Sequence, residues 1–450
     1  MVRGASAPGG TAGSGTWLAT SGGVCSATGV RRHTAVAAVA LVLTTGVAMV
    51  QTVPAGAGSG PPLPGQDPFY RYTGVTPLAQ IHPGTVLKHR AVTVSFGTAA
   101  STPVEAEQLL YRTTGQLGQP TVTVTTVLEP TPVPVVAHIV EYLSFYDGLG
   151  AQCDPSYTLR GGDPGGSTNE QEADEEELLV SWYMSQGDIV TVPDFEGTHL
   201  DWMAGRESGY GALDAVRATE SWLHLRPSAA VGLSGYSGGA VAADWASELA
   251  PAYAPKLHLV GVAEGGIPAN YIDMFHYIDG TAEYSAAIPG MLVGLSRAYG
   301  VDLSQYLSPY GLQVAGAEDQ VCIASVFGTY PGLTISQIMQ PQYADIYDVP
   351  VFASMLGAQT MGTARTHPRE PLFMAVGNVD GTGDGAMVAA DVRALARRYC
   401  GEGVPVEYQE YQGFSHVDAG ALFEPQTGPF LQARLAGVPF LGNCSSLGTS

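Results

Sequence analysis

Apolar residues recur at every second position in parts of the first third of the chain, which is typical of β-strands. In Thr121–Val127 the first threonines fall on one face and the valines between them on the other, as in a strand with one buried side. Ala91–Phe96 has the same β-branched character, and Val135–Val140 is a more continuous apolar run that only His138 interrupts. Asp188–Pro193 predicts a buried strand that leads into a loop.

Farther along the chain, predicted strands alternate with segments whose apolar residues follow helical spacing. The predicted helices are Tyr210–Leu225, Ala240–Leu249 and Ala389–Tyr399, and the predicted strands are Ala230–Ser234, Leu257–Val262, Leu372–Val376 and Val404–Tyr411. Strands that alternate with helices imply a mostly parallel sheet with helices on both faces. The sequence therefore predicts an α/β fold.

Two segments depart from this alternation. Residues 268–350 are rich in Tyr, Met, Leu and Gly and show no clear strand, so we expect a helical insertion there. It would divide one core into a first part, residues 58–267, and a C-terminal part, residues 351–450. The acidic run Glu170–Glu177 holds six carboxylates after Thr168 and Asn169, which predicts the solvated start of a helix.

Residues 1–57 have the organisation of a secretory signal peptide. The positive pair Arg31-Arg32 precedes Ala35–Val50, a largely apolar run of 16 residues, and Ala55–Ala57 then offers a small-x-small cleavage site. An apolar run of this length is short for a membrane span, which needs about 20 residues. We therefore expect export to the extracellular space, with no stable insertion into a membrane.

Composition narrows the possible partners. The chain has 41 Asp and Glu against 19 Lys and Arg, which argues against nucleic acid because phosphate binding needs clustered cations. Five cysteines are present, and removal of the predicted signal with Cys25 leaves four. An even number in an exported protein suggests two disulfides, for which three pairings are possible. There is no CxxC pair or zinc-type His spacing, so we expect no metal or organic cofactor.

The motif Gly235-Tyr236-Ser237-Gly238-Gly239 fits G-x-S-x-G. It lies between a predicted strand and a predicted helix, which is the setting that the nucleophile elbow of the α/β-hydrolase fold requires. Glycines remove side chains that would clash in so tight a turn. Ser237 is therefore the candidate nucleophile, and the backbone N–H of Gly238 is a candidate donor to the oxyanion.

A serine needs a general base, which a carboxylate must orient, and in this fold the order is Ser, acid, His. Four histidines follow Ser237: His258, His276, His367 and His416. Only the last follows the last predicted strand, near the C-terminus, where the base is expected. We therefore assign the base to His416.

Two aspartates can supply the acid after the strand Leu372–Val376. Asp380 is favoured by counting from the end of the strand, and Asp384 by counting back from the following helix. We prefer Asp380, because the end of a strand is the more rigid position, and keep Asp384 as the alternative. The other aspartate would bind backbone groups of the loop, as Asp commonly does in turns.

With these motifs the chain resembles the secretory lipases, the family of Candida antarctica lipase A and its actinobacterial relatives. The resemblance extends from about Asp67 to the C-terminus with no large gap. The segments that carry it are Asp67–Tyr70, Ser144–Asp147, Cys153–Tyr157, Val192–Gly197, Gly205–Tyr210, Leu213–Arg217, Gly235–Gly239, Cys400–Gly403 and His416.

The resemblance implies a secreted α/β-hydrolase that cleaves triacylglycerols or other fatty-acid esters. It implies that Asp147 is the second oxyanion-hole residue, that the insertion is a helical cap over the site, and that contact with a lipid surface is possible. It also implies the disulfides Cys153–Cys322 and Cys400–Cys444. Two alternatives remain open: a secreted serine peptidase of the same fold, and a non-catalytic binding protein that keeps the scaffold.

Overall fold

The computed structural model describes residues 61–94, 104–131, 136–162, 168–225, 229–343 and 345–448; within helix α2, side chains are described from Glu175 on and at Ala173. These residues belong to one compact unit, Gly58–Ser450. The predicted signal peptide, residues 1–57, lies outside the described residues. So do parts of the predicted strands Ala91–Phe96 and Val135–Val140.

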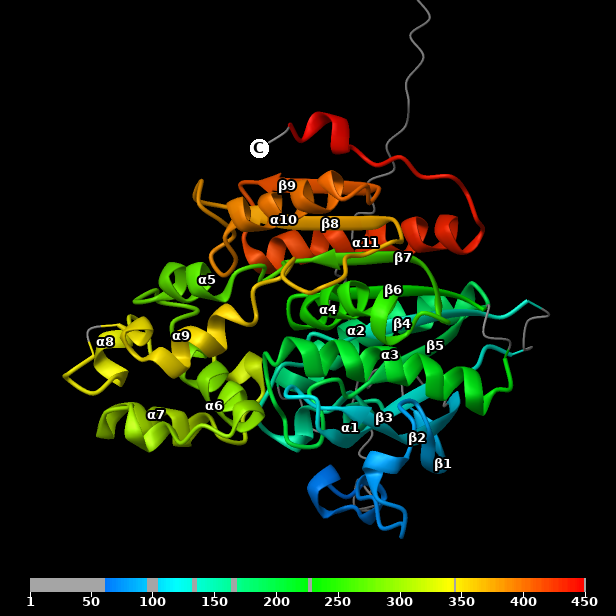
Figure 1. Ribbon diagram of the computed structural model, residues 1–450, viewed down its shortest axis with the longest axis horizontal. Helices are drawn as coiled ribbons and strands as arrows, with labels where there is room; N and C mark the ends of the chain where they lie inside the picture. The colour runs from blue at the N-terminus through cyan, green and yellow to red at the C-terminus, as the bar shows by residue number, and fades with distance from the viewer. Residues whose placement is uncertain are drawn as a thin grey trace, which may run out of the picture. The chain divides into compact units, whose positions relative to one another are not determined.

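A nine-stranded sheet forms the centre of the unit, in the order β1-β2-β3-β5-β4-β6-β7-β8-β9 (Figure 1). The strands are β1 Val86–Val94, β2 Val104–Thr114, β3 Pro120–Leu128, β4 His138–Leu143, β5 Ile189–Pro193, β6 Ala230–Tyr236, β7 His258–Gly265, β8 Leu372–Asn378 and β9 Val406–Gln412. Pairs from β1 to β5 are antiparallel, and all pairs from β5 through β4 to β9 are parallel. The predicted mostly parallel α/β sheet is confirmed.

Helices cover both faces of this sheet. The long helices are α2 Thr168–Ser185, α3 Gly205–Trp222, α4 Gly238–Tyr253, α10 Ala389–Gly401 and α11 His416–Leu435, and a short α1 spans Pro155–Thr158. Side chains of β8 alternate between the faces: Met374 joins the large core with α3, α4 and α10, whereas Phe373 stacks on Phe423 of α11. Among the helices of the described residues, none has both the length and the apolar character needed to cross a bilayer.

The segment between β7 and β8 is helical, as the sequence predicted. It contains α5 Tyr271–Ile278, α6 Ala287–Tyr299, α7 Pro309–Glu318, α8 Ile335–Ile338 and α9 Pro350–Gly357, which gather on the left in Figure 1. Because α9 begins at Pro350, helical structure continues beyond the expected end of the insertion.

Two covalent and several polar contacts hold the insertion and the C-terminus to the core. The disulfides are Cys153–Cys322 and Cys400–Cys444, so the pairing implied by the family resemblance is confirmed. The first joins the loop after β4 to the insertion. The Arg297 guanidinium of α6 also donates to the backbone oxygens of Leu149 and Leu200, which belong to core loops.

We expect the two disulfides to contribute unequally to stability. Cys153–Cys322 closes a separation of 169 residues and Cys400–Cys444 one of 44. Loss of chain entropy in the unfolded state grows with the logarithm of the closed loop, so the longer loop should contribute about 1 kcal/mol more. Denaturant unfolding of the Cys153→Ser/Cys322→Ser and Cys400→Ser/Cys444→Ser proteins would measure this difference. Equal losses would show that chain entropy does not dominate.

Candidate active site

Ser237 lies on a sharp turn between β6 and α4. Its φ of 53° and ψ of −115° are rare for a residue with a side chain, and such strain persists only where the surroundings impose it. The neighbouring glycines make the turn possible. A Cβ at Gly235 would lie 2.3 Å from the Gly239 oxygen, and one at Gly239 would lie 2.0 Å from the Leu143 oxygen. The strand–turn–helix setting predicted for the nucleophile is therefore present.

The register of the parallel strands brings four loops to this turn. Leu143 at the end of β4 pairs with Gly235, and Gly265 at the end of β7 pairs with Ala375 of β8. Asn378, where β8 ends, pairs with Gln412, where β9 ends. Because the carboxyl ends of parallel strands share one edge, the loops after β4, β6, β8 and β9 converge there.

His416 is the first residue of α11, and the residue is 6% exposed. Its Nε2 lies 2.9 Å from Ser237 Oγ, and its Nδ1 lies 2.9 Å from Asp384 Oδ2. The Tyr236 hydroxyl donates to the backbone oxygen of His416, and the backbone N–H of His416 donates to the backbone oxygen of Asp384. The structure therefore brings together Ser237, His416 and Asp384.

The preference for Asp380 over Asp384 is corrected by this geometry. Asp380 is exposed, and its carboxylate accepts hydrogen bonds from the backbone of Thr382 and Gly383 and from the Tyr277 hydroxyl. It has the role that was expected of the aspartate outside the triad: it organises the loop. Asp384 is fully buried.

A small closed loop explains why counting from the strand end failed. The backbone N–H of Val379 donates to the Gly383 oxygen at 2.7 Å, so the chain turns back on itself after β8. A Cβ placed at Gly377 would consequently lie 2.8 Å from Asp384 Cβ, which puts Asp384 beside the strand end. Its Oδ1 accepts from the backbone of Ala386 and Met387, which leaves Oδ2 for His416.

The other candidate histidines lie elsewhere. His258 is an exposed residue at the start of β7. His276 lies in α5, where its Nε2 is 3.1 Å from an Asp345 oxygen. His367 is on the surface near Glu402. None of these three contacts Ser237 in the described part of the chain.

Asp147 and Gly238, the two predicted oxyanion-hole residues, are neighbours. A Cβ at Gly238 would lie 1.8 Å from Asp147 Oδ1, so only glycine leaves room for this carboxyl. Gly238 is the first residue of α4, where a backbone N–H has no partner within the helix. Burial raises the pKa of Asp147 to about 7. A protonated Asp147 can donate a hydrogen bond near the nucleophile at acidic and neutral pH.

The loop that carries Asp147 is held from two sides. On one side, the Ile323 backbone donates to the Asp147 oxygen, next to the disulfide at Cys322. On the other, Glu176 of α2 accepts hydrogen bonds from the Ser144 hydroxyl at 2.6 Å and the Phe145 backbone at 2.8 Å. The prediction that the run Glu170–Glu177 is a solvated helix start is therefore wrong at Glu176 and Glu177, which are buried.

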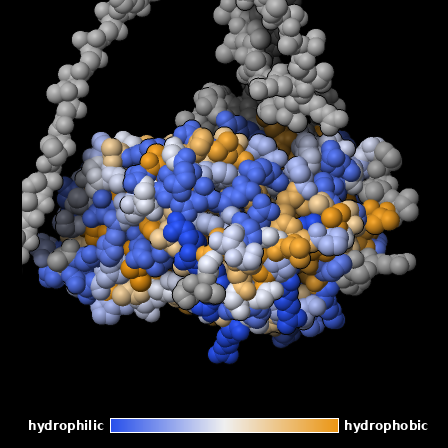
Figure 2. Space-filling view, turned by 90° about the horizontal axis from the view of Figure 1, so that it is seen from above, coloured by the Kyte–Doolittle hydropathy of each residue, from blue (hydrophilic) through white to orange (hydrophobic). Residues whose placement is uncertain are grey.

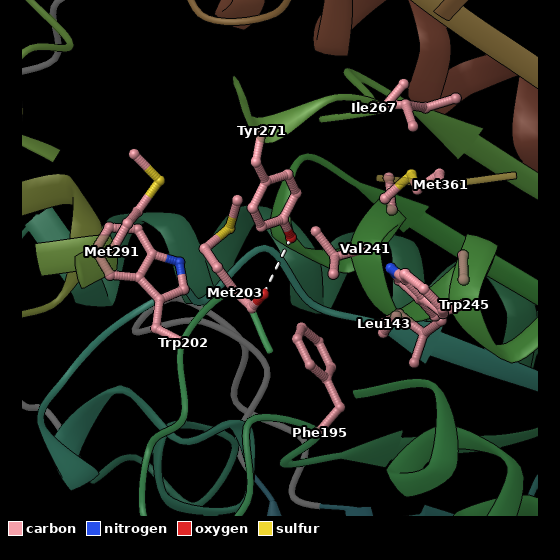
Figure 3. Packing of buried hydrophobic residues seen from close by; sticks show 14 of the residues in the cluster. Leu143, Phe195, Trp202, Met203, Val241, Trp245, Ile267, Tyr271, Met291 and Met361 are labelled. Carbon is pink, nitrogen blue, oxygen red and sulfur yellow. Dashed lines mark hydrogen bonds between the residues drawn. The ribbon is translucent and has the colours of Figure 1, made fainter. Parts of the chain in front are cut away.

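An apolar cavity of about 50 Å³ opens from Ser237 beneath the insertion. Trp202, Met203, Met274 and Met291 are among the residues that line it. Figure 3 shows Trp202, Met203 and Met291 near Tyr271, whose hydroxyl donates to the Met203 oxygen. The sequence analysis missed Trp202 and Met203; their place in the loop after β5, close to the strand-exit motif, was the available signal.

A second, larger cleft of about 550 Å³ reaches Ser237 from the side of α2 and α11. Its lining includes Phe145, Leu178, Leu179 and Val417 together with His416. Leu178 and Val417 are 69% and 66% exposed, so the cleft has an apolar rim. Hydrophobic patches also appear among hydrophilic ones on the face shown in Figure 2.

The chain matches known proteins over most of its length. A family model described as "Secretory lipase" matches residues 167–443. A Mycobacterium tuberculosis protein named as a probable inactive lipase is 31% identical, over 84% of each chain. A secreted triacylglycerol lipase of Malassezia restricta is 28% identical, over 85% of this chain and 82% of its own.

Among solved structures, Candida antarctica lipase A in its closed state superposes with a TM-score of 0.76 and 26% identity. The match covers 84% of this chain and 88% of that chain. The motifs from Val192–Gly197 to His416 lie within the residues that the family model matches. The chain belongs to the secretory lipase family.

Proposed function

We propose that the protein is a secreted serine lipase or carboxylesterase that acts through an acyl-enzyme on Ser237. One observation carries the proposal: His416 lies 2.9 Å from Ser237 Oγ on one side and 2.9 Å from Asp384 Oδ2 on the other. Nucleophile, base and orienting acid in this order are the machinery of acyl transfer. Membership of the secretory lipase family points to carboxylic esters as substrates.

The carboxylate of Asp384 accepts hydrogen bonds only, so the proton of the neutral His416 ring resides on Nδ1. Nε2 is then free to accept the proton of Ser237 as Oγ attacks the ester carbonyl. The carbonyl oxygen becomes negatively charged, and the Gly238 N–H and the protonated Asp147 donate to it. His416 returns its proton to the leaving alcohol, and water then releases the fatty acid by the same steps.

The acyl chain would enter the cavity beneath the insertion, because its lining of Trp, Met and Ile side chains offers an apolar surface away from water. The insertion α5–α9 would then act as the cap of this acyl site. Leu178 and Val417, exposed on the rim of the cleft, would contact a lipid surface.

We also propose export by way of a cleaved signal within residues 1–57. Two disulfides fit an oxidising compartment, and the Malassezia restricta relative is named as secreted. Neither alternative function is favoured. A peptidase has no support among the reported relatives, and the assembled triad argues against a protein that only binds.

Ser237→Ala should abolish hydrolysis of short p-nitrophenyl esters and emulsified triglyceride, because no other group replaces Oγ. Far-ultraviolet circular dichroism and the unfolding midpoint should match the parent protein. A fluorophosphonate probe should label the parent and not the variant. Full turnover by the variant would refute the assignment, and cleavage of aminoacyl amides without cleavage of fatty-acid esters would favour a peptidase.

Substitution of Asp384 and substitution of Asp380 should have clearly different effects on kcat. Asp384→Asn removes the acceptor that sets the His416 tautomer, so kcat should fall about 10⁴-fold, as in other serine triads. Asp380→Asn changes only an exposed loop contact and should keep kcat within about tenfold of the parent value. Steady-state kinetics on one soluble ester would measure both. A greater loss in the Asp380 variant would restore the strand-end prediction.

The pH dependence of kcat should report the protonation state of Asp147. Its pKa of about 7 lies above the usual value, so it donates to the oxyanion below pH 7 and ceases to donate as pH rises further. We expect kcat to fall on this alkaline side. Asp147→Asn keeps a donor at every pH and should flatten that limb, whereas Asp147→Ala should lower kcat about 10²- to 10³-fold. An unchanged alkaline limb in the Asn variant would exclude this role.

A further inference from the structure

The larger cleft continues away from Ser237 between helices α2 and α11. Leu178, Leu179 and Glu424 line both the cleft and a neighbouring hollow of about 400 Å³, so the two form one groove. Trp182 and Pro429 extend its apolar wall at the far end. The groove leads away from the apolar cavity under the insertion, and the residues that line both are Asp147, Ser237, Ile323, Phe327 and His416.

The position of His416 indicates which part of an ester enters this groove. His416 must return its proton to the oxygen of the departing alcohol, so that oxygen lies against Nε2. His416 begins α11, and Val417, Gly420 and Ala421 on the next turns line the groove. The alcohol portion of the substrate therefore extends along α11, while the acyl chain occupies the cavity beneath the insertion.

The walls of this groove are acidic. Glu175, Glu176 and Glu424 are among the residues that line it, and no Lys or Arg is among those lining residues. The sequence of α2 likewise contains no Lys or Arg, and that of α11 has only Arg434, in its last turn. An anionic group bound in the groove would therefore lie near carboxyl groups, with no Lys or Arg of the lining to compensate its charge.

Glu424 is the carboxyl best placed to interact with a charged group of a ligand in the groove. Its Oε2 is buried and has no hydrogen-bond partner among the described residues, so it can accept one from a ligand. Burial, followed by repulsion from Glu176, raises the pKa of Glu424 to about 8. The titratable groups that face it are Glu176 and Tyr183 of α2, Tyr142 of β4 and Tyr236 of β6.

We propose that the groove between α2 and α11 is a leaving-group subsite that accepts neutral or cationic alcohols and rejects anionic ones, and that Glu424 determines this specificity. The inference rests on the proposed esterase function. Esters whose alcohol carries a phosphate or sulfonate are then poor substrates, whereas glycerides and amine-bearing alcohols are accepted. The discrimination is stronger above pH 8, where Glu424 is ionised, than at acidic pH.

Three butyrate esters test this directly: those of choline, of its neutral isostere 3,3-dimethylbutan-1-ol, and of 2-hydroxyethanesulfonate. All three form the same butyryl-enzyme, so ratios of kcat/KM report only on the alcohol portion. The intrinsic reactivities of the three esters are measured by their hydrolysis without enzyme, and each ratio is divided by the corresponding ratio of these rates. At pH 9 we expect the choline ester to exceed the sulfonate by about tenfold or more, and at pH 5.5 by about threefold or less. Asp147 and Glu176 also line the groove, and burial raises the pKa of both to about 7, so they ionise over the same range. The comparison with Glu424→Gln therefore assigns the change in the ratio to Glu424.

Glu424→Gln should reduce the pH 9 ratio by about threefold or more, because its amide cannot ionise. Glu175→Gln, a milder change at an exposed position of the same wall, should reduce it to a smaller extent. Glu105→Gln removes the same charge from an exposed position on β2 and serves as the control that leaves the ratio unchanged.

The outcomes distinguish failure of the leaving-group subsite from failure of the esterase function. Active enzyme with a choline-to-sulfonate ratio near one at pH 9 would overturn the subsite and leave the esterase function standing. A ratio that Glu424→Gln leaves unchanged would overturn the role of Glu424, and one that Glu175→Gln also leaves unchanged would overturn the role of this wall. Absence of hydrolysis of all three esters and of p-nitrophenyl butyrate would refute the esterase function itself.

Discussion

The hydrogen bond between Asp384 and His416 is the contact on which the site depends. Asp384 is fully buried, and a buried carboxylate is costly unless its oxygens are satisfied. Here Oδ1 accepts two backbone N–H groups and Oδ2 faces His416 Nδ1. The His416 backbone N–H also donates to the backbone oxygen of Asp384. The loop after β8, the start of α11 and the ring of the base are therefore fixed together, and the register of β6 and β8 places them beside Ser237.

Buried carboxyls without cations recur throughout the protein. Glu141 and Glu264, on the central strands β4 and β7, have no hydrogen-bond partner for either oxygen among the described residues, and burial raises the pKa of both. Burial also raises the pKa of Glu318 to about 8. The folded chain thus binds more protons than the unfolded chain above about pH 4.5, so its stability falls as pH rises through the raised pKa values. Asp147 and Glu424 are two further carboxyls with raised pKa values, and both lie at the site. In the proposed roles, protonated Asp147 donates a hydrogen bond, and protonated Glu424 leaves its wall of the groove uncharged.

Much of the fold and most of the site could be predicted from the sequence. The strands and helices around Gly235–Gly239 have strong periodicity, and the elbow motif is specific. Helix α11 beyond His416 was missed, because Pro425 and Pro429 interrupt its sequence pattern. The choice between Asp380 and Asp384 depended on a turn closed by one backbone hydrogen bond, which residue counting does not detect. The burial of Glu176 escaped prediction because a run of carboxylates does not show which of them faces the loop before Asp147.

The arrangement separates chemistry from specificity. The proposed triad and oxyanion groups lie on the ends of sheet strands and on the helices that begin there, where the register of the sheet fixes them. The insertion, which lies outside that framework, covers the apolar cavity. The groove lies between α2, which is also outside it, and α11, which begins at His416 and belongs to it. Glu176 joins the two functions, because it lines the groove while it holds Ser144 and Phe145 in the loop before Asp147. A change in the groove that spares Glu176 can therefore alter which alcohol is accepted without displacing the oxyanion donors, whereas a change at Glu176 affects both.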